Sequence, residues 1–275
     1  MKRERASANS MRGYDLSVEG RPRIRVLDDA SALAQAAARM IVEAADEAVA
    51  ARGRFIIALA GGATPRDTYS QLARSPLRDA MPWADTWVFF GDERAVSIEH
   101  AESNYRMAHA TLLSLVPLPL AQVFRMGGEA EDQEAAATEY IAALRRVFAT
   151  KRGELPRFDM VLLGLGVDGH TASLFPYSAA LKETVRWVVS VHAGAAAIPA
   201  RLTMTLPVLN AARRVMFLAA GSEKAKVIRA VLQDGARVPA RMVYPAEGTL
   251  DWLLDRPAAS NLEPRRPWRA DPDWI

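Results

Sequence analysis

Apolar residues follow two patterns along this chain. Apolar residues repeat every three or four positions, as in amphipathic helices, near residues 33–48, 65–73, 104–114, 131–149 and 222–233. Short apolar runs predict strands at residues 24–27, 55–60, 87–90, 160–164, 187–191 and 215–219. Strands that alternate with helices predict an α/β fold, a three-layer αβα sandwich around a mainly parallel, Rossmann-like sheet.

The two ends of the chain differ from its middle. Residues 1–22 are polar, and the residues after Asp255 are rich in proline, arginine and tryptophan. We interpret residues 1–22 as a disordered leader, residues 23–259 as a single α/β domain and residues 260–275 as a tail. Neither an internal repeat nor a long linker forces a further domain boundary.

Composition removes several classes of protein. The 275 residues include no cysteine, which excludes disulfides, thiolate nucleophiles and iron–sulfur clusters. The net charge of +3 comes from basic residues near the ends, so we expect no nucleic-acid partner. No apolar run reaches about 18 residues and no secretory signal is evident, so we expect a cytoplasmic protein without a membrane span. The sequence does not determine whether the protein is a monomer or a homodimer.

The first candidate site follows the run at residues 55–60. Ligands of such folds bind beyond the carboxyl ends of the strands. Gly61 and Gly62 stand there, with Thr64 as the predicted N-cap and Pro65 as the first residue of the next helix. Glycines before a helix allow backbone N–H groups to approach an anion, which indicates a phosphate site. A plain tight turn would have the same sequence.

Two further segments offer charged groups. Asp92, Glu93 and Arg94 crowd together after the run at residues 87–90. A solvated charged turn is the more common explanation of a single such triplet, but its position at the carboxyl edge of the sheet favours a ligand. Arg201 alternates with apolar residues and shares one face of a predicted strand with Thr203. That face suits an anion pocket, although an exposed sheet face would look identical.

A glycine-rich segment follows the run at residues 160–164. Its glycines match a dinucleotide-binding pattern, but Pro176 leaves no room for the helix which that fold requires. The segment also places Asp168 two residues before His170. Imidazole moves protons near neutral pH, and a carboxylate can orient it. We therefore predict that His170 is a general base assisted by Asp168.

The last candidate is Lys224. Ser222 is the predicted N-cap of a helix over residues 222–233, in which Lys224 lies in line with the apolar residues Ile228 and Val231. A cation there opposes the helix dipole, so we expect an anion against it. The signatures of serine hydrolases, P-loop proteins and zinc hydrolases are absent. The remaining groups suit attack by water, or a proton shift, on a small phosphorylated molecule.

Six segments, in the same order along the chain, resemble the 6-phosphogluconolactonase family. They are AGGATP at residues 60–65, GDER at 91–94, SNY at 103–105, GVDGHTASLFP at 166–176, RLTMT at 201–205 and GSEKA at 221–225. The resemblance extends over residues 24–259. Ala63 and Tyr177 depart from the family's usual residues.

The resemblance implies hydrolysis of 6-phospho-D-glucono-1,5-lactone to 6-phosphogluconate, in the pentose phosphate pathway, without a metal or organic cofactor. It implies His170 as base, oriented by Asp168. The groups expected to bind the sugar phosphate are Gly61, Gly62, Thr64, Arg201 and Lys224 at the phosphate, and Asp92 and Arg94 at the sugar end.

Two alternatives remain at this point. Glucosamine-6-phosphate deaminases of the wider superfamily carry a glutamate shortly after the corresponding histidine, and here Phe175 stands in its place. The substitution speaks against a deaminase. A sugar-phosphate sensor without catalysis would need an output module, for which the leader is too short.

Overall fold

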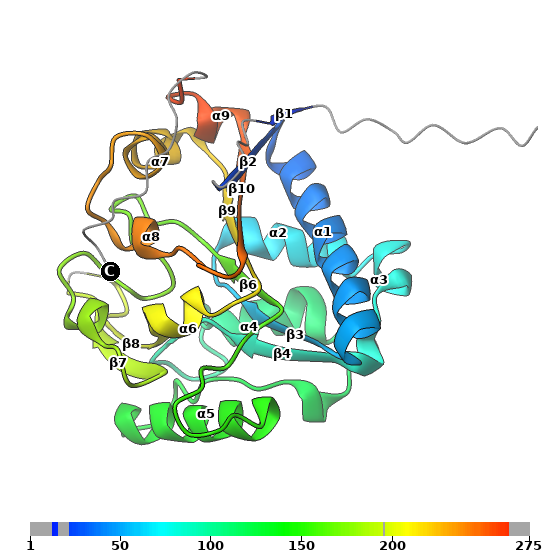
Figure 1. Ribbon diagram of the computed structural model, residues 1–275, viewed down its shortest axis with the longest axis vertical. Helices are drawn as coiled ribbons and strands as arrows, with labels where there is room; N and C mark the ends of the chain where they lie inside the picture. Colours follow the sequence, from blue (N-terminus) through cyan, green and yellow to red (C-terminus); the bar gives the residue numbers. More distant parts are fainter. Residues whose placement is uncertain (1–12, 16–21, 195, 264–275) are drawn as a thin grey trace, which may run out of the picture.

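A seven-stranded sheet forms the middle layer of the molecule (Figure 1). The computed structural model describes residues 13–15, 22–194 and 196–263. The strand order is β1-β2-β10-β9-β6-β3-β4, in which only the β1–β2 pair is antiparallel. These strands are β1 (Gly13–Asp15), β2 (Arg23–Leu27), β3 (Phe55–Leu59), β4 (Thr86–Phe90), β6 (Met160–Leu163), β9 (Arg214–Ala219) and β10 (Thr249–Asp255). The predicted α/β sandwich with a mainly parallel sheet is confirmed.

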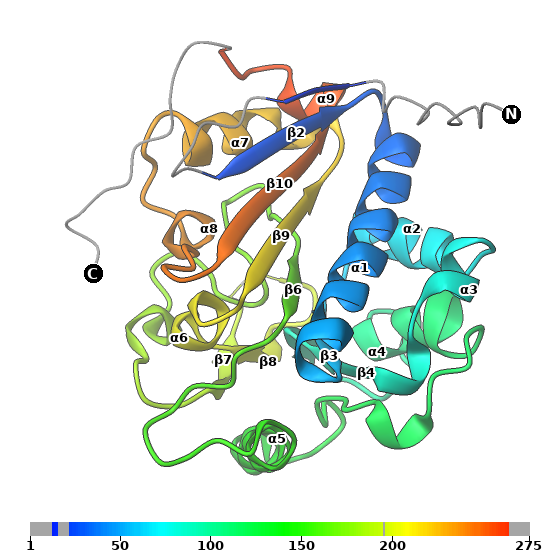
Figure 2. The same ribbon diagram turned by 45° about the vertical axis from the view of Figure 1, so that its right-hand side comes forward.

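Helices cover both faces of this sheet (Figure 2), and each face has its own hydrophobic core. One face carries α1 (Ala30–Arg52), α2 (Ala63–Leu72), α3 (Leu77–Ala80) and α4 (Asn104–Ala108), which a π-helical turn (His109–Leu113) extends. The other carries α5 (Gln133–Phe148), α6 (Leu206–Asn210), α7 (Ala225–Leu232), α8 (Pro239–Met242) and α9 (Arg256–Ala259). Short 3₁₀ turns lie at Trp83–Asp85, Leu120–Gln122, Ala179–Lys182 and Ser222–Lys224. No helix within the described ranges combines the length and the apolar character that a membrane crossing requires.

Helix α1 shows how the local sequence sets an element. The Asp29 carboxylate accepts the N–H of Ala32 at 2.8 Å and begins the helix. Gly53 ends it in a left-handed conformation, with φ of +71°. Leu33, Ile41 and many alanines of the inner face are buried, and these small side chains bring the helix close against the sheet. The predicted helical periodicity here is confirmed.

A second sheet corrects one prediction. Residues 187–191 were expected to form a strand buried on both faces, like those of the parallel sheet. They form instead β7 (Val188–His192), which pairs antiparallel with β8 (Ala200–Met204), which in turn pairs with β5 (Asp92–Arg94). The burial of β7 falls from Val188 to His192, so its first residues are buried and its last residue is exposed.

The ends of the chain differ in part from the interpretation. Gly13–Asp15, within the predicted leader, form strand β1 against β2. Residues 1–12 and 16–21 lie outside the described residues. Strand β10 was not predicted, because Asp251 and Asp255 interrupt its apolar run. Asp251 is nevertheless buried, since Arg23 of β2 forms an ion pair with it at 2.7 Å. Residues 264–275 of the tail also lie outside the described residues, and the domain boundaries stay a prediction.

Candidate active site

A cavity of about 340 Å³ lies at the carboxyl ends of β3, β4, β6 and β9. The chain runs from β3 to β4 on one side of β3, whereas β6 and the later strands lie on the other side. Such a switch in strand order opens a crevice where ligands of α/β folds bind. The lining includes almost every predicted site residue, namely Gly61, Gly62, Thr64, Asp92, Arg94, His170, Arg201 and Lys224. Asp168 is hydrogen-bonded to one of them, His170.

The glycine turn after β3 begins helix α2 earlier than predicted. The helix starts at Ala63, with Gly62 as N-cap at φ of +106°, so the prediction of Thr64 as the cap was wrong. Glycine adopts this backbone conformation readily, and it brings the chain into the helix two residues sooner. The Tyr69 hydroxyl accepts the N–H of Ala60 at 2.9 Å and donates to its carbonyl at 2.8 Å. Tyr69 thus holds the backbone of Ala60, just before the turn, and residues 61–64 of the turn line the cavity.

His170, which lines the cavity, forms a short hydrogen bond with Asp168. The Nδ1 atom of His170 lies 2.6 Å from Oδ1 of Asp168, and the backbone N–H of His170 donates to the same oxygen at 3.1 Å. The His170 side chain is 30% exposed. A ring that donates its Nδ1–H to a carboxylate leaves Nε2 without a proton when the ring is neutral. The geometry therefore leaves Nε2 available as a base.

The charge of Asp168 supports this tautomer. Partial burial acts to raise the pKa of Asp168, but the hydrogen bonds and the charge of His170 outweigh it and hold that pKa below its ordinary value. The loop itself is closed by a hydrogen bond from Gly166 N–H to the His170 carbonyl at 2.8 Å. The Thr171 hydroxyl donates to the Gly164 carbonyl, also at 2.8 Å. The carboxylate stays ionised and the loop holds it against the ring.

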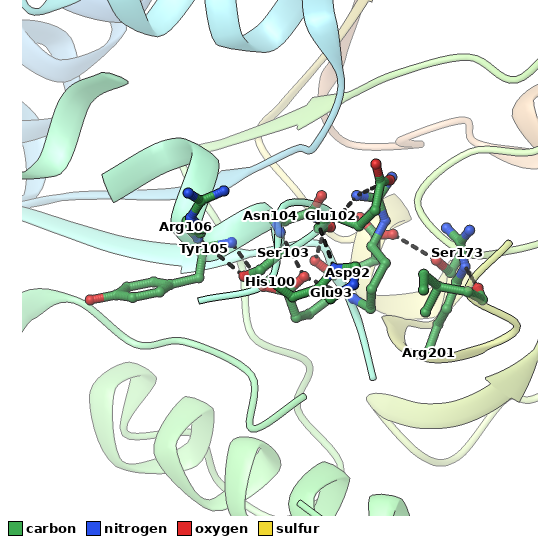
Figure 3. A network of polar contacts seen from close by, with 12 residues as sticks. Asp92, Glu93, His100, Glu102, Ser103, Asn104, Tyr105, Arg106, Ser173 and Arg201 are labelled. Carbon is green, nitrogen blue, oxygen red and sulfur yellow. Dashed lines mark hydrogen bonds and ion pairs between the residues drawn. The ribbon is translucent and has the colours of Figure 1, made fainter. Parts of the chain in front are cut away.

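The two neighbouring acids after β4 serve different purposes (Figure 3). Asp92 is 6% exposed, accepts the Ser173 hydroxyl at 2.6 Å and lines the cavity. Glu93 instead accepts the N–H groups of Asn104 at 2.7 Å and Tyr105 at 2.8 Å, at the start of α4. Burial raises the pKa of Glu93, against the effect of these hydrogen bonds. Glu93 therefore holds the helix, and Asp92 faces the site.

Two arginines stand opposite each other in the small sheet. The register of β5 and β8 pairs Arg94 with Arg201, and both line the cavity. Burial lowers the pKa of Arg201, and the nearby Arg94 charge lowers it further. Within the described residues Arg201 has no ion pair, and Thr203 beside it is fully buried. The alternative of an exposed sheet face is wrong, and the paired cations favour an anion.

Lys224 also lines the cavity. It ends a 3₁₀ turn, and α7 begins only at Ala225, so the predicted cap at Ser222 was wrong. Gly221, at φ of +99°, produces this turn, and its N–H donates to both carboxylate oxygens of Asp255 at 3.1 Å. Lys224 is half-buried, and no described side chain forms an ion pair with it. The predicted inward position of Lys224 is confirmed.

Three residues of the site were not predicted to have a role there. Phe175 lies with its ring centroid 4.5 Å from that of His170 and 5.4 Å from the Arg201 guanidinium. Ser173 and Asn104 both donate hydrogen bonds to Asp92. The sequence signal for Ser173 and Asn104 was only their presence in the glycine-rich and SNY segments, whereas Phe175 was noted in place of the deaminase glutamate. Among the described residues, no three histidine or acidic side chains gather in a way that could hold a metal ion.

Comparison with known proteins agrees with this arrangement. The family described as "Glucosamine-6-phosphate isomerases/6-phosphogluconolactonase" matches residues 28–252. The chain belongs to this family. A 6-phosphogluconolactonase of Synechocystis sp. is 41% identical over 246 residues, which cover 88% of this chain and 99% of that protein.

Solved structures within the family are also similar. The 6-phosphogluconolactonase from Trypanosoma cruzi has a TM-score of 0.78 and 32% identity, over 89% of this chain and 98% of that one. The 6-phosphogluconolactonase from Trypanosoma brucei has a TM-score of 0.76 and 35% identity, over 88% of this chain and 99% of that one. The family resemblance predicted from the six motifs is therefore confirmed.

Proposed function

We propose that this protein hydrolyses 6-phospho-D-glucono-1,5-lactone to 6-phosphogluconate, a reaction of the pentose phosphate pathway. The observation that carries the proposal is the hydrogen bond between His170 and Asp168, which leaves Nε2 free in a cavity that also holds several cations. The names of the relatives in both comparisons support the same reaction.

His170 activates water in this proposal. Nε2 takes a proton from a water molecule as its oxygen attacks C1 of the lactone, and the carbonyl oxygen becomes an oxyanion. Asp168 stabilises the imidazolium that forms. The imidazolium then returns the proton to the ring oxygen as the bond from C1 to that oxygen breaks. General-base catalysis of this kind contributes about 10²–10⁴-fold, enough for an ester that already hydrolyses in water.

The cations bind the substrate. Arg201, Lys224 and the backbone N–H groups of the turn at residues 61–64 hold the 6-phosphate, because charge-assisted hydrogen bonds and a helix N-terminus both favour a dianion. Arg94 and Asp92 lie at the sugar end. With the phosphate fixed at one end, C1 is brought to Nε2.

Phe175 separates this reaction from the deaminase alternative. Its ring packs on His170, and among the described residues only Asp168 has a carboxylate hydrogen-bonded to this imidazole. Ring opening of an amino sugar phosphate would need a further acid there, whereas a lactone already has an electrophilic carbonyl.

The test is acid release from freshly prepared 6-phosphogluconolactone, measured against spontaneous hydrolysis, with ammonia release from glucosamine 6-phosphate as the parallel assay. We expect acid release far above the spontaneous rate and no ammonia. Ammonia release, or a lactone rate equal to the spontaneous one, would contradict the proposal. Binding of 6-phosphogluconate without turnover would indicate a sensor.

A further inference from the structure

The ring of Phe175 packs against two side chains that line the cavity but does not line it itself. Its centroid lies 4.5 Å from that of the His170 ring, and the two planes are inclined at 36°. The Cζ atom of Arg201 lies over the same phenyl ring, 5.4 Å from its centroid. Phe175 is half-buried and outside the cavity lining, which includes His170 and Arg201. Phe175 therefore contacts the proposed base and a proposed phosphate ligand without facing the substrate.

A strained turn brings this ring back to His170. Ala172 has φ of +47°, in the left-handed region that is unfavourable for a residue with a Cβ atom. Two backbone hydrogen bonds between Thr171 and Leu174, at 2.9 and 3.3 Å, close the turn, so that Phe175 returns to the residue before it. Such strain persists only where the surrounding structure holds it, and it clusters at functional sites. The position of the Phe175 ring is thus a candidate for that function.

Stacking on Phe175 restrains the imidazole of His170. Asp168 holds this imidazole by one short hydrogen bond at Nδ1, which by itself allows the ring plane to tilt. The phenyl ring limits the tilt and so directs Nε2. In the proposed reaction His170 becomes an imidazolium, and the negative face of an aromatic ring attracts a cation. The contact therefore favours both the direction and the charge that the base needs.

The same ring restrains Arg201. The Nε atom of Arg201 donates to the Ile198 carbonyl at 3.0 Å, and the like charge of Arg94 lies opposite in the register of the small sheet. Contact with the ring face fixes the direction of the guanidinium where none of the described carboxylates forms an ion pair with it. We propose that Phe175 is a positioning residue, which fixes His170 and Arg201 relative to each other for the proposed lactonase reaction, on which this inference rests.

The experiment measures kcat for 6-phosphogluconolactone and inhibition by inorganic phosphate in Phe175→Leu, which keeps an apolar side chain but removes the ring. We expect kcat to fall about 10-fold, because a displacement of about 1 Å can cost about 10²-fold. Phosphate should inhibit about 2–5-fold less strongly, the size of a partly exposed cation–π contact. Phe175→Tyr, which keeps the ring, should retain the wild-type kcat and phosphate inhibition.

A second background separates positioning from a general loosening of the site. In Arg201→Met, the further change Phe175→Leu should no longer alter phosphate inhibition, because the guanidinium that the ring restrains is already gone. The same change should still lower kcat, because the contact with His170 is lost in either background. General loosening would instead weaken phosphate inhibition in both backgrounds.

Phe148→Leu is the matched control for lost aromatic packing. Phe148 is also half-buried, its ring centroid lies 4.9 Å from that of Phe158, and it is outside the cavity lining. This variant should lower the midpoint of urea unfolding without changing kcat or phosphate inhibition. Phe175→Met, with a flexible apolar side chain, takes the place of Phe175→Leu if the leucine variant fails to fold.

Three results would overturn the role of Phe175 while the lactonase reaction stands. The folded Phe175→Leu variant could keep the wild-type kcat and phosphate inhibition, it could weaken inhibition equally in the Arg201→Met background, or Phe175→Tyr could show the same losses. If wild type does not accelerate hydrolysis of the lactone, the proposed function fails and this inference with it.

Discussion

The two halves of the cavity differ in how far their polar groups are satisfied. At the end of β6, His170 and Asp168 satisfy each other at 2.6 Å. At the small sheet and the β9 turn, Arg94 faces Arg201, Lys224 has no described ion-pair partner and Oδ1 of Asn104 has no donor. The catalytic pair is satisfied without substrate, whereas in the binding half Lys224 forms no ion pair among the described residues, although Arg94 contacts Glu102 and Arg201 donates to the Ile198 carbonyl. Removal of a group should therefore affect turnover in the first half, and affinity or stability in the second.

The largest effect is expected in the catalytic half. His170→Ala removes the base and should lower kcat by about 10²–10⁴-fold, while inhibition by inorganic phosphate stays nearly normal. His192→Ala is the control, because His192 is exposed at the end of β7 and outside the cavity lining. Near-normal turnover of the His170 variant would contradict the role of His170 as the general base.

The next effect belongs to the binding half. Lys224→Ala removes a cation that has no ion-pair partner among the described residues, and if it binds the phosphate as proposed it should raise KM by about 10–100-fold, as for a hydrogen bond to a charged group. Lys226→Ala, in an exposed position two residues later, should change nothing. A loss in kcat alone, with phosphate inhibition unchanged, would contradict the role of Lys224 in binding.

A smaller effect should appear as increased stability. Like charges directly opposite in a sheet are destabilising, so Arg201→Met should raise the free energy of unfolding by roughly 0.2–1 kcal/mol while it weakens phosphate binding. Urea unfolding measures the first and phosphate inhibition the second. Arg39→Met, at an exposed position on α1, serves as the control. A destabilised Arg201 variant would mean that the arginine stabilises the fold even without an anion.

An effect of similar size concerns the dependence of stability on pH. The pKa of Asp168 is lower in the folded protein than the value of about 3.9 in an unfolded chain. Its contribution to stability is therefore present above about pH 4 and is lost as the pH falls through the folded value. At neutral pH the free energy of unfolding of wild type should be about 0.2–1 kcal/mol higher than that of Asp168→Asn. The difference is small because the pair is partly exposed. A difference that stays constant from pH 7 to pH 3 would contradict this.

The parts of the site that could be predicted from sequence depend on short-range relations. Asp168 and His170 are two residues apart, and the ends of parallel strands must meet at one edge of the sheet. The position of Lys224 followed from helical spacing with Ile228. Such relations survive folding because few other segments can alter them.

The rest depended on distant segments or on backbone geometry. The pairing of Arg94 with Arg201 joins strands more than a hundred residues apart, which no local pattern contains. Thr64 and Ser222 are good N-caps by type, but glycines at positive φ set where both turns begin. Strand β10 was missed because Asp251 interrupts its apolar pattern. The ion pair that lets Asp251 be buried comes from Arg23, which is distant in the sequence.

The most direct test of the account is the protonation of the His170 ring, measured by ¹⁵N NMR with the ring neutral. The spectrum of His170→Ala identifies its signals among the four histidines. The account predicts a proton on Nδ1, shared with Asp168, and none on Nε2. A neutral ring with its proton on Nε2 would contradict it, because that nitrogen could not then accept a proton from water.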